Sequence, residues 1–173
     1  MKRVCLGMFL MVLSVGCTAQ APTQTGTAEQ SSTQGTEKAI APEETETEAA
    51  QITNVNVSGN SGNYTFAITI ASPDTGCDAY ANWWEVVSPD ETLIYRRILA
   101  HSHINEQPFT RSGGPINIET NQPVIVRVHM HPSGYSNLAM EGTTSKGFIP
   151  TTLPPSFAAE LASAEPQPNG CAF

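Results

Sequence analysis

The alternation of apolar and polar residues in a series of short segments is the feature that most constrains how this chain can fold. Segment Asn63–Ser72 carries apolar side chains at every second position, namely Tyr64, Phe66, Ile68 and Ile70. Because successive side chains of a strand point to opposite faces, this spacing predicts a strand with one buried face. Segment Ile52–Gly59 alternates less regularly, and the Gly and Asn residues between the two segments predict a hairpin turn.

More segments of this kind follow, separated by turn residues: Ala79–Val87, Thr92–His101, Pro115–Thr120, Pro123–His131 and Thr143–Ile149. About six or seven short strands without a convincing internal helix predict an all-β fold, an antiparallel β-sandwich that resembles immunoglobulin and fibronectin type III domains. Segment Pro154–Pro166 predicts one short C-terminal helix packed on the sandwich. Segment Glu106–Gly114 is expected to be an ordered loop from which Phe109 reaches the core.

The first residues of the chain predict export. Lys2 and Arg3 form a short basic region, and the apolar run Val4–Val15 has the length of a signal-peptide core. This run is too short to cross a bilayer as a helix of the mature protein. Residues 1–16 are therefore expected to be a signal peptide.

The residues that end at Cys17 resemble a bacterial lipobox, in which small residues precede a cysteine that is acylated after cleavage. The resemblance implies a lipidated Cys17 and attachment to the membrane through this lipid anchor, although Ser14 stands where a lipobox usually has Leu. Because Thr18 is not the aspartate that often retains such proteins in the inner membrane, the expected location is the outer membrane or the cell surface, on its periplasmic or extracellular side. The alternative is secretion with cleavage near Ala19 or Ala21.

Residues 17–50 and 51–173 differ sharply in composition. After Cys17 the first part consists largely of Thr, Gln, Ser, Ala and Glu, without aromatic residues, and is expected to be a disordered tether because it cannot bury enough apolar surface to offset its chain entropy. Residues 51–173 are expected to form the β-sandwich domain. The formal charge of the chain is −8, which becomes −10 without Lys2 and Arg3 and excludes nucleic acid as an expected partner.

Two cysteines remain in the predicted domain, Cys77 and Cys171. Two thiols in an oxidising compartment usually pair, so a Cys77–Cys171 disulfide is expected to pin the C-terminal end of the chain to the loop before Ala79–Val87. A redox pair or a thiolate metal ligand is the alternative, which the lack of a C-x-x-C motif disfavours.

The four histidines of the chain form two His-x-His pairs, His101 with His103 and His129 with His131, each at the end of a predicted strand. Residues two apart on a strand share a face, so each pair could bind one metal ion with two imidazoles. If both strands flank Ala79–Val87, the pairs reach the same edge of the sandwich and could together hold Zn or Cu. Possible neighbours of this site are the sulfur atoms of Met130 and Met140 and the carboxylate of Asp78.

The register of one hairpin decides whether the two pairs can meet. A four-residue loop after Val87 would put Tyr95 and Leu99 in the core beside Trp84 and would point the histidine pairs to opposite faces. A three-residue loop would shift the register by one residue and leave both pairs on the outside. The turn residues fit a type I turn in either loop, so both registers stay open.

Segment Cys77–Tyr135 is similar to domains of uncharacterised secreted bacterial proteins, a resemblance that implies no activity. Of the neighbouring Trp83 and Trp84, only the outward-facing one could bind a sugar, and whichever of Arg96 and Arg97 faces outward is expected to pair with Glu85.

Three hypotheses about function follow from the sequence. The first is a non-catalytic binding or interaction module for a protein or glycan of the cell envelope, for which no catalytic residue is predicted. The second is a transition-metal protein that uses His101, His103, His129 and His131 to bind Cu or Zn. A copper oxidoreductase ranks third, since an enzyme would need an open coordination position that the sequence does not identify.

Overall fold

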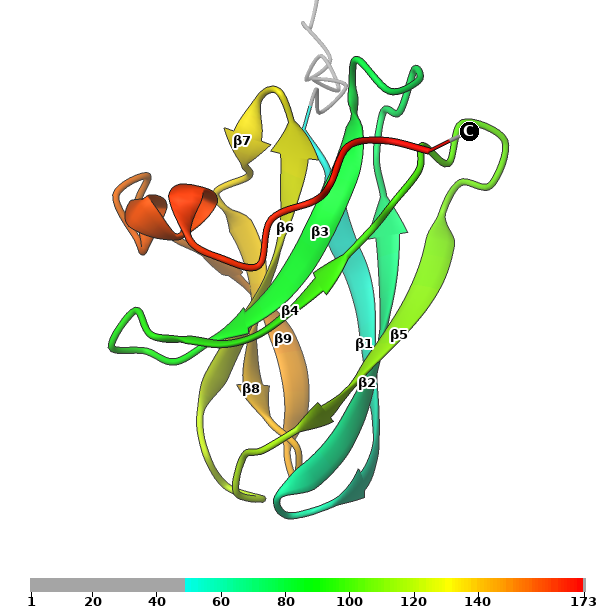
Figure 1. The fold of residues 1–173 in the computed structure, drawn as a ribbon. Coiled ribbons are helices and arrows are strands. Elements are labelled where there is room, and N and C mark those ends of the chain that lie inside the picture. The colour runs from blue at the N-terminus through cyan, green and yellow to red at the C-terminus, as the bar shows by residue number, and fades with distance from the viewer. Residues whose placement is uncertain (1–48, 173) are drawn as a thin grey trace, which may run out of the picture. The chain divides into compact units, whose positions relative to one another are not determined.

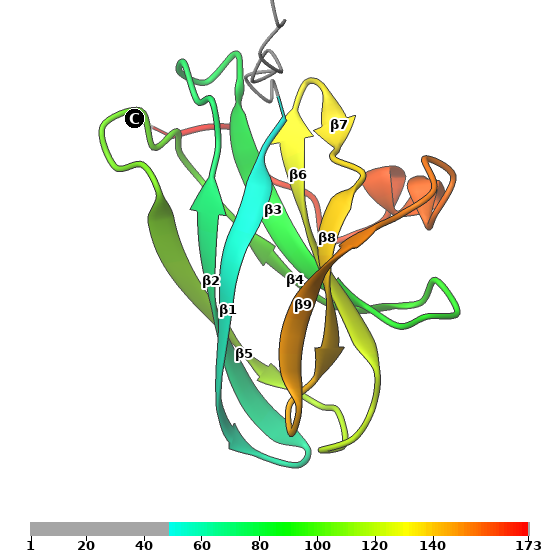
Figure 2. The same cartoon turned by 180° about the vertical axis from the view of Figure 1, so that it is seen from behind.

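The computed structural model describes residues 49–172, which form two antiparallel sheets packed face to face (Figures 1 and 2). The smaller sheet has the order β1-β2-β5, with β1 Gln51–Asn60, β2 Asn63–Ala71 and β5 Phe109–Ile116. The larger sheet has the order β4-β3-β6-β8-β9, with β4 Leu93–Ile98, β3 Tyr80–Val87, β6 Val124–His131, β8 Leu138–Thr143 and β9 Gly147–Thr152. The short strand β7, Gly134–Tyr135, also pairs with β6. The prediction of an all-β fold is confirmed.

The core lies between the two sheets and follows the alternation of the sequence. The side chains predicted to face inward from β2, at positions 64, 66, 68 and 70, are all buried. They pack against inward residues of the larger sheet, which are Trp84 and Val86 of β3 and Val124, Val126, Val128 and Met130 of β6. Met140 belongs to the same apolar cluster, so both methionines proposed as metal donors have packing roles.

A β-bulge in strand β1 explains the irregular alternation of apolar residues in this segment of the sequence. Its register with β2 shifts between Ile52 and Asn54, so the inward face passes from Ile52 to Val55 and Val57 rather than keeping a spacing of two. An extra residue in one strand of an antiparallel pair produces this shift.

The prediction of an ordered loop over Glu106–Gly114 is wrong, because most of this segment forms strand β5. Strand β5 contains both glycines of the segment, and neither marks a turn. A Cβ atom on Gly113 would lie 2.7 Å from the Tyr95 hydroxyl oxygen and 2.8 Å from a ring carbon of Trp84, so glycine allows these aromatic side chains to approach the strand. Phe109 reaches the core as predicted, with 1% of its surface exposed.

The β3–β4 hairpin adopts the register that separates the histidine pairs. Val86 lies opposite Tyr95 and Trp84 opposite Arg97, with a shift in register next to the turn. As a result Leu99 and Tyr95 pack with the core, the outcome expected for the four-residue loop. Trp83 therefore faces outward and Trp84 inward.

The C-terminal segment, residues 154–172, crosses the outer face of the larger sheet (Figure 1). The expected helix is a five-residue 3-10 helix, Ala159–Ser163, whose Leu161 packs on Val87 of β3. A disulfide joins Cys77 to Cys171, as the sequence predicts. The predicted signal peptide, Cys17 and all but the last two residues of the tether lie outside the described residues. Within residues 49–172, no helix is long and apolar enough to span a membrane.

Candidate functional site

A buried cluster of charges lies on the outer face of the larger sheet. The carboxylate of Glu85 accepts a hydrogen bond from Arg96 Nε and another from Arg127 Nε, both at 2.8 Å. Glu85 is fully buried, and Arg96 and Arg127 are only 6% and 2% exposed. The pairing of Arg96 with Glu85 is the predicted one, whereas Arg127 was not foreseen as a second partner.

The C-terminal segment seals this cluster. The terminal nitrogens of the two guanidinium groups, Nη1 and Nη2 of Arg96 and Arg127, donate to five backbone carbonyls of this segment. These are the carbonyls of Phe157, Ala158, Leu161, Ala164 and Pro166. These carbonyl dipoles offset the surplus positive charge of two cations around one carboxylate. Because the donors are committed to the protein itself, the cluster has a structural role and offers no binding site for a ligand.

His129 is packed into the same outer face. Its ring stacks on Trp83 with centroids 3.8 Å apart and meets the edge of Tyr135, and its Nδ1 lies 2.7 Å from the side-chain oxygen of Asn82. Burial, with further contributions from Arg96 and Arg127, lowers the pKa of His129 to about 4. His129 is therefore a neutral, packed side chain at physiological pH. Its partner in the pair, His131, is exposed at the end of β6.

His101 and His103 lie in the loop between β4 and β5, which covers residues 99–108. The His103 ring is stacked on Phe109 with centroids 3.7 Å apart. The centroid of the His101 ring lies 4.5 Å from the centroid of the His103 ring. The side chain of His103 is 1% exposed. Among the described residues, neither ring nitrogen of His103 has a hydrogen-bond partner. Burial, followed by the charge of Arg111, lowers the pKa of His103 and favours the neutral imidazole.

Asp74 organises the end of the sandwich where this loop lies. Its buried carboxylate accepts hydrogen bonds from Ser72 Oγ at 2.7 Å, from the Ala81 amide at 2.9 Å and from the His103 amide at 2.8 Å. One of its oxygens lies 3.8 Å from His103 Nδ1. Asp74, rather than the predicted Asp78, is thus the carboxylate beside the histidines. The sequence offers little signal for this role, because Asp74 follows a proline in what reads as an ordinary turn.

A cavity of about 340 Å³ lies against the His101–His103 loop. Loop residues 101–106 form one wall, and Gly76 and Ala172 complete it. Since Gly76 and Ala172 adjoin the two disulfide-bonded cysteines, the Cys77–Cys171 bond holds together two chain segments that line this cavity. We call it the histidine cavity.

The structure does not unite the two histidine pairs. His103 contacts Phe109, a core residue, whereas His129 contacts Trp83 on the outer face of the larger sheet. Within residues 49–172, no three His, Cys, Asp or Glu side chains are grouped so that they could hold a metal ion. The single four-imidazole site considered from the sequence is therefore not formed by the described residues.

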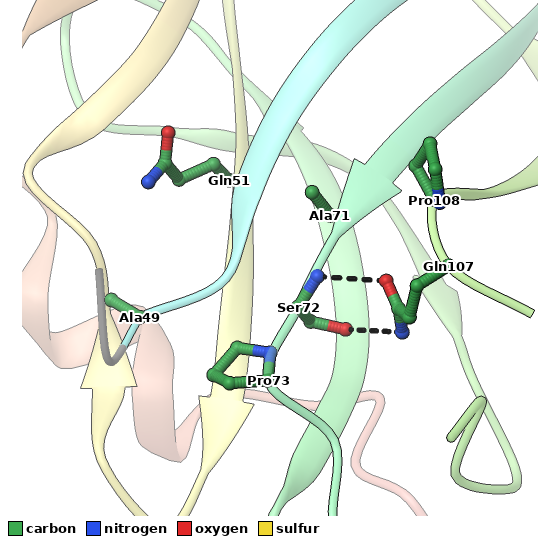
Figure 3. A pocket seen from close by; sticks show the side chains of 7 residues that line it. All are labelled: Ala49, Gln51, Ala71, Ser72, Pro73, Gln107 and Pro108. Carbon is green, nitrogen blue, oxygen red and sulfur yellow. Dashed lines mark hydrogen bonds between the residues drawn. The ribbon is translucent and has the colours of Figure 1, made fainter. Parts of the chain in front are cut away.

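A second cavity, of about 470 Å³, lies where the described chain begins (Figure 3). Three polar side chains line it, those of Gln51, Ser72 and Gln107. Ser72 and Gln107 are bonded to each other: the Ser72 backbone amide donates to Gln107 Oε1 at 2.9 Å, and Gln107 Nε2 donates to Ser72 Oγ at 3.1 Å. This cavity thus presents one neutral amide, that of Gln51, beside a pair that is already bonded, whereas the histidine cavity is lined by two imidazoles and a carboxylate.

Comparison with known proteins gives one informative similarity. The chain is 34% identical over 120 residues to a protein of Halomicrobium mukohataei named "Putative lipoprotein". The aligned region covers 66% of this chain and 59% of that protein, so the chain spans less than two thirds of the length of this relative. No protein-family model matches the chain, and no solved structure matches it. The similarity is thus to a protein named for its lipid attachment, without a stated activity.

Proposed function

We propose that this protein is an exported lipoprotein whose β-sandwich serves as a non-catalytic binding module at the cell envelope. Three parts are proposed: a signal peptide over residues 1–16, a lipidated Cys17 followed by a tether to residue 50, and the sandwich over residues 51–173. The name of the relative and the lipobox-like sequence that ends at Cys17 support the lipid anchor. The proposed location is the outer membrane or the cell surface.

We also propose that the sandwich belongs to the immunoglobulin and fibronectin type III class. The strand orders support this assignment, because β1-β2-β5 opposite β4-β3-β6-β8 corresponds to A-B-E opposite C′-C-F-G in that class. Domains of this kind commonly bind partners through loops at one end, and the loop of residues 99–108 lies at such an end.

The observation that carries the binding proposal is the histidine cavity. An imidazole contains one donor and one acceptor in its neutral form, and leaving a buried polar group unsatisfied costs about 1–3 kcal/mol. His103 is held beside a cavity with both nitrogens in this state. Both nitrogens are closed to solvent, so a ligand or partner group in the cavity would reach and satisfy one of them after a small movement of the loop of residues 99–108.

The lipid anchor is tested by metabolic labelling with an alkyne-bearing fatty acid. The wild-type protein is expected to incorporate the label and to fractionate with membranes, and the Cys17→Ser variant is expected to lose both properties. Equal labelling of the two proteins would contradict lipidation at Cys17.

The binding module is tested by photo-crosslinking in cells. A photoreactive amino acid replaces Ile104, which is 53% exposed on the wall of the histidine cavity, or Ile149, which is 70% exposed on β9 in a control variant. Adducts with an envelope component are expected from position 104 only. Equal adduct formation at both positions, or none at position 104, would contradict the cavity as the binding site.

Transition-metal binding is the second candidate function, and the specific observation in its favour is the close approach of the His101 and His103 rings. This candidate no longer needs the second histidine pair.

A further inference from the structure

We propose that His101 and His103 form a two-imidazole site for a divalent transition-metal ion, Zn²⁺ or Cu²⁺, at the wall of the histidine cavity. This inference rests on the proposed function of the cavity as a binding site and names the chemical class of its ligand. Imidazole nitrogen is a preferred ligand of both ions. The remaining coordination positions would be taken by water or by groups of a bound partner.

The separation of the two rings fits binding to one ion. An imidazole nitrogen lies about 2.0–2.1 Å from a bound Zn²⁺, which places the ring centroid about 3.2 Å from the ion. Two imidazoles that subtend about 90–110° at the ion therefore have centroids about 4.5–5.2 Å apart. The centroids of His101 and His103 are 4.5 Å apart. The loop thus already holds the rings at the spacing of adjacent ligands.

The state of His103 also favours metal binding. A metal ligand must present a neutral imidazole with a nitrogen that is not already hydrogen-bonded, and neither ring nitrogen of His103 has a protein partner within the described chain. Both nitrogens are also buried, so a small movement of the loop of residues 99–108 has to open one of them to the ion. The stacking of His103 on Phe109 fixes the plane of the ring, so little side-chain entropy remains to be lost on binding.

Two carboxylates near the pair provide the surrounding chemistry. Asp74 anchors the loop through the His103 amide, and its Oδ2 is 3.8 Å from His103 Nδ1. A small shortening of this distance would make the carboxylate–histidine contact that orients metal ligands and raises their basicity, leaving Nε2 for the ion. Glu106 also lines the cavity, where Arg111 now binds both of its oxygens. Arg111 compensates the charge of Glu106 in this arrangement, so Glu106 would act as a ligand or a counter-charge only after releasing Arg111.

The second histidine pair lacks these properties and supplies a matched control. His129 is bonded to Asn82 through Nδ1 and stacked on Trp83, so its ring is occupied by the fold. His131 is exposed like His101 and is also a member of a His-x-His pair. Each exposed histidine lies beside one buried ring, His101 beside His103 and His131 beside Tyr80, so the two replacements are also matched in what they uncover.

The test is isothermal titration of the purified, chelator-treated protein with ZnCl₂ and, separately, with CuSO₄. One equivalent of metal is expected to bind per chain. The His101→Ala variant is expected to weaken binding by at least about tenfold, whereas the His131→Ala variant is expected to bind as the wild type does. His103→Gln is a second variant, and its far-ultraviolet circular dichroism verifies that the fold is retained. The Cu²⁺ complex is expected to show coupling to two imidazole nitrogens by electron paramagnetic resonance, reduced to one in His101→Ala.

Absence of stoichiometric binding, or an equal loss in His101→Ala and His131→Ala, would overturn the metal site. The crosslinking experiment at Ile104 needs no metal, so the two failures are separable. Crosslinking without metal binding would refute this inference and keep the binding module, whereas metal binding without site-specific crosslinking would keep the metal site and refute the partner-binding module.

Discussion

The neutral, buried state of His129 predicts a specific loss of stability in acid. The pKa of His129 is lowered from 6.5 to about 4 in the folded protein, first by burial and then by Arg96, Arg127 and His131. In the unfolded chain the group binds a proton near its ordinary pKa of about 6.5. As the pH falls from about 6.5 to about 4, the unfolded state therefore gains a proton that the folded state cannot accept, and folding stability decreases.

The size of this effect follows from the two pKa values. Each pKa unit corresponds to about 1.36 kcal/mol, so a single histidine with these values lowers the free energy of unfolding by about 2 kcal/mol between about pH 7 and about pH 5. The 9% exposure of His129 leaves little solvent screening to reduce this figure. The lowered pKa of His103 acts in the same direction, so the wild-type protein is expected to lose more than the His129 contribution alone.

The measurement is urea unfolding of the purified protein at both pH values, compared with the variants His129→Gln and His131→Gln. Gln at position 129 keeps an amide that can bond to Asn82 and does not titrate in this range. The pH-dependent loss is expected to be about 2 kcal/mol smaller in His129→Gln than in the wild type. It is expected to change only slightly in His131→Gln, because His131 makes the smallest of the named contributions to the lowered pKa of His129. An identical pH dependence of the wild type and His129→Gln would refute the assignment of a neutral His129 in the fold.

Two further predictions concern the covered outer face. The Glu85→Gln variant leaves two buried guanidinium groups without their carboxylate and is expected to lower the free energy of unfolding by about 3–5 kcal/mol, measured by urea denaturation, while the exposed Glu141→Gln should change it little; a loss under about 1 kcal/mol in Glu85→Gln would contradict a sealed cluster. The Cys77–Cys171 bond closes a loop with a sequence separation of 94, so its reduction is expected to cost up to about 4–5 kcal/mol and to increase hydrogen exchange in residues 154–172. Unchanged exchange in that segment after reduction would show that the arginine contacts hold it without the disulfide.

The candidate site was only partly predictable. Both His-x-His pairs were identifiable from sequence, but their neighbours were not. Asp74 approaches His103 through a contact between residues 29 positions apart, and no local pattern marks it as a buried acceptor. The hairpin register that separates His103 from His129 depends on a shift beside the turn, which the turn residues left open.

The sequence by itself determined two kinds of feature: those that repeat with the short period of a strand, and those for which few residue pairings are possible. The alternation in β2 set which side chains are buried, because strand geometry repeats every two residues. The neighbouring Trp83 and Trp84 had to face opposite ways for the same reason. The Cys77–Cys171 disulfide followed from counting, since the predicted domain contains two of the four cysteines of the chain and two cysteines allow one pairing.

Only the tertiary structure decided how these elements meet. Glycine at position 113 of β5 is required by the side chains of Tyr95 and Trp84, which approach it from other strands. The bulge in β1 is defined by the pairing of that strand with β2. Burial of Glu85 depends on carbonyl groups supplied by residues 157–166, more than 70 positions along the chain. Such contacts are set by the energy of the assembled fold, because their partners are distant in sequence and have no periodic signature. The assembled fold likewise packs His129 against Trp83 on the outer face of the larger sheet and places His101 and His103 beside the histidine cavity.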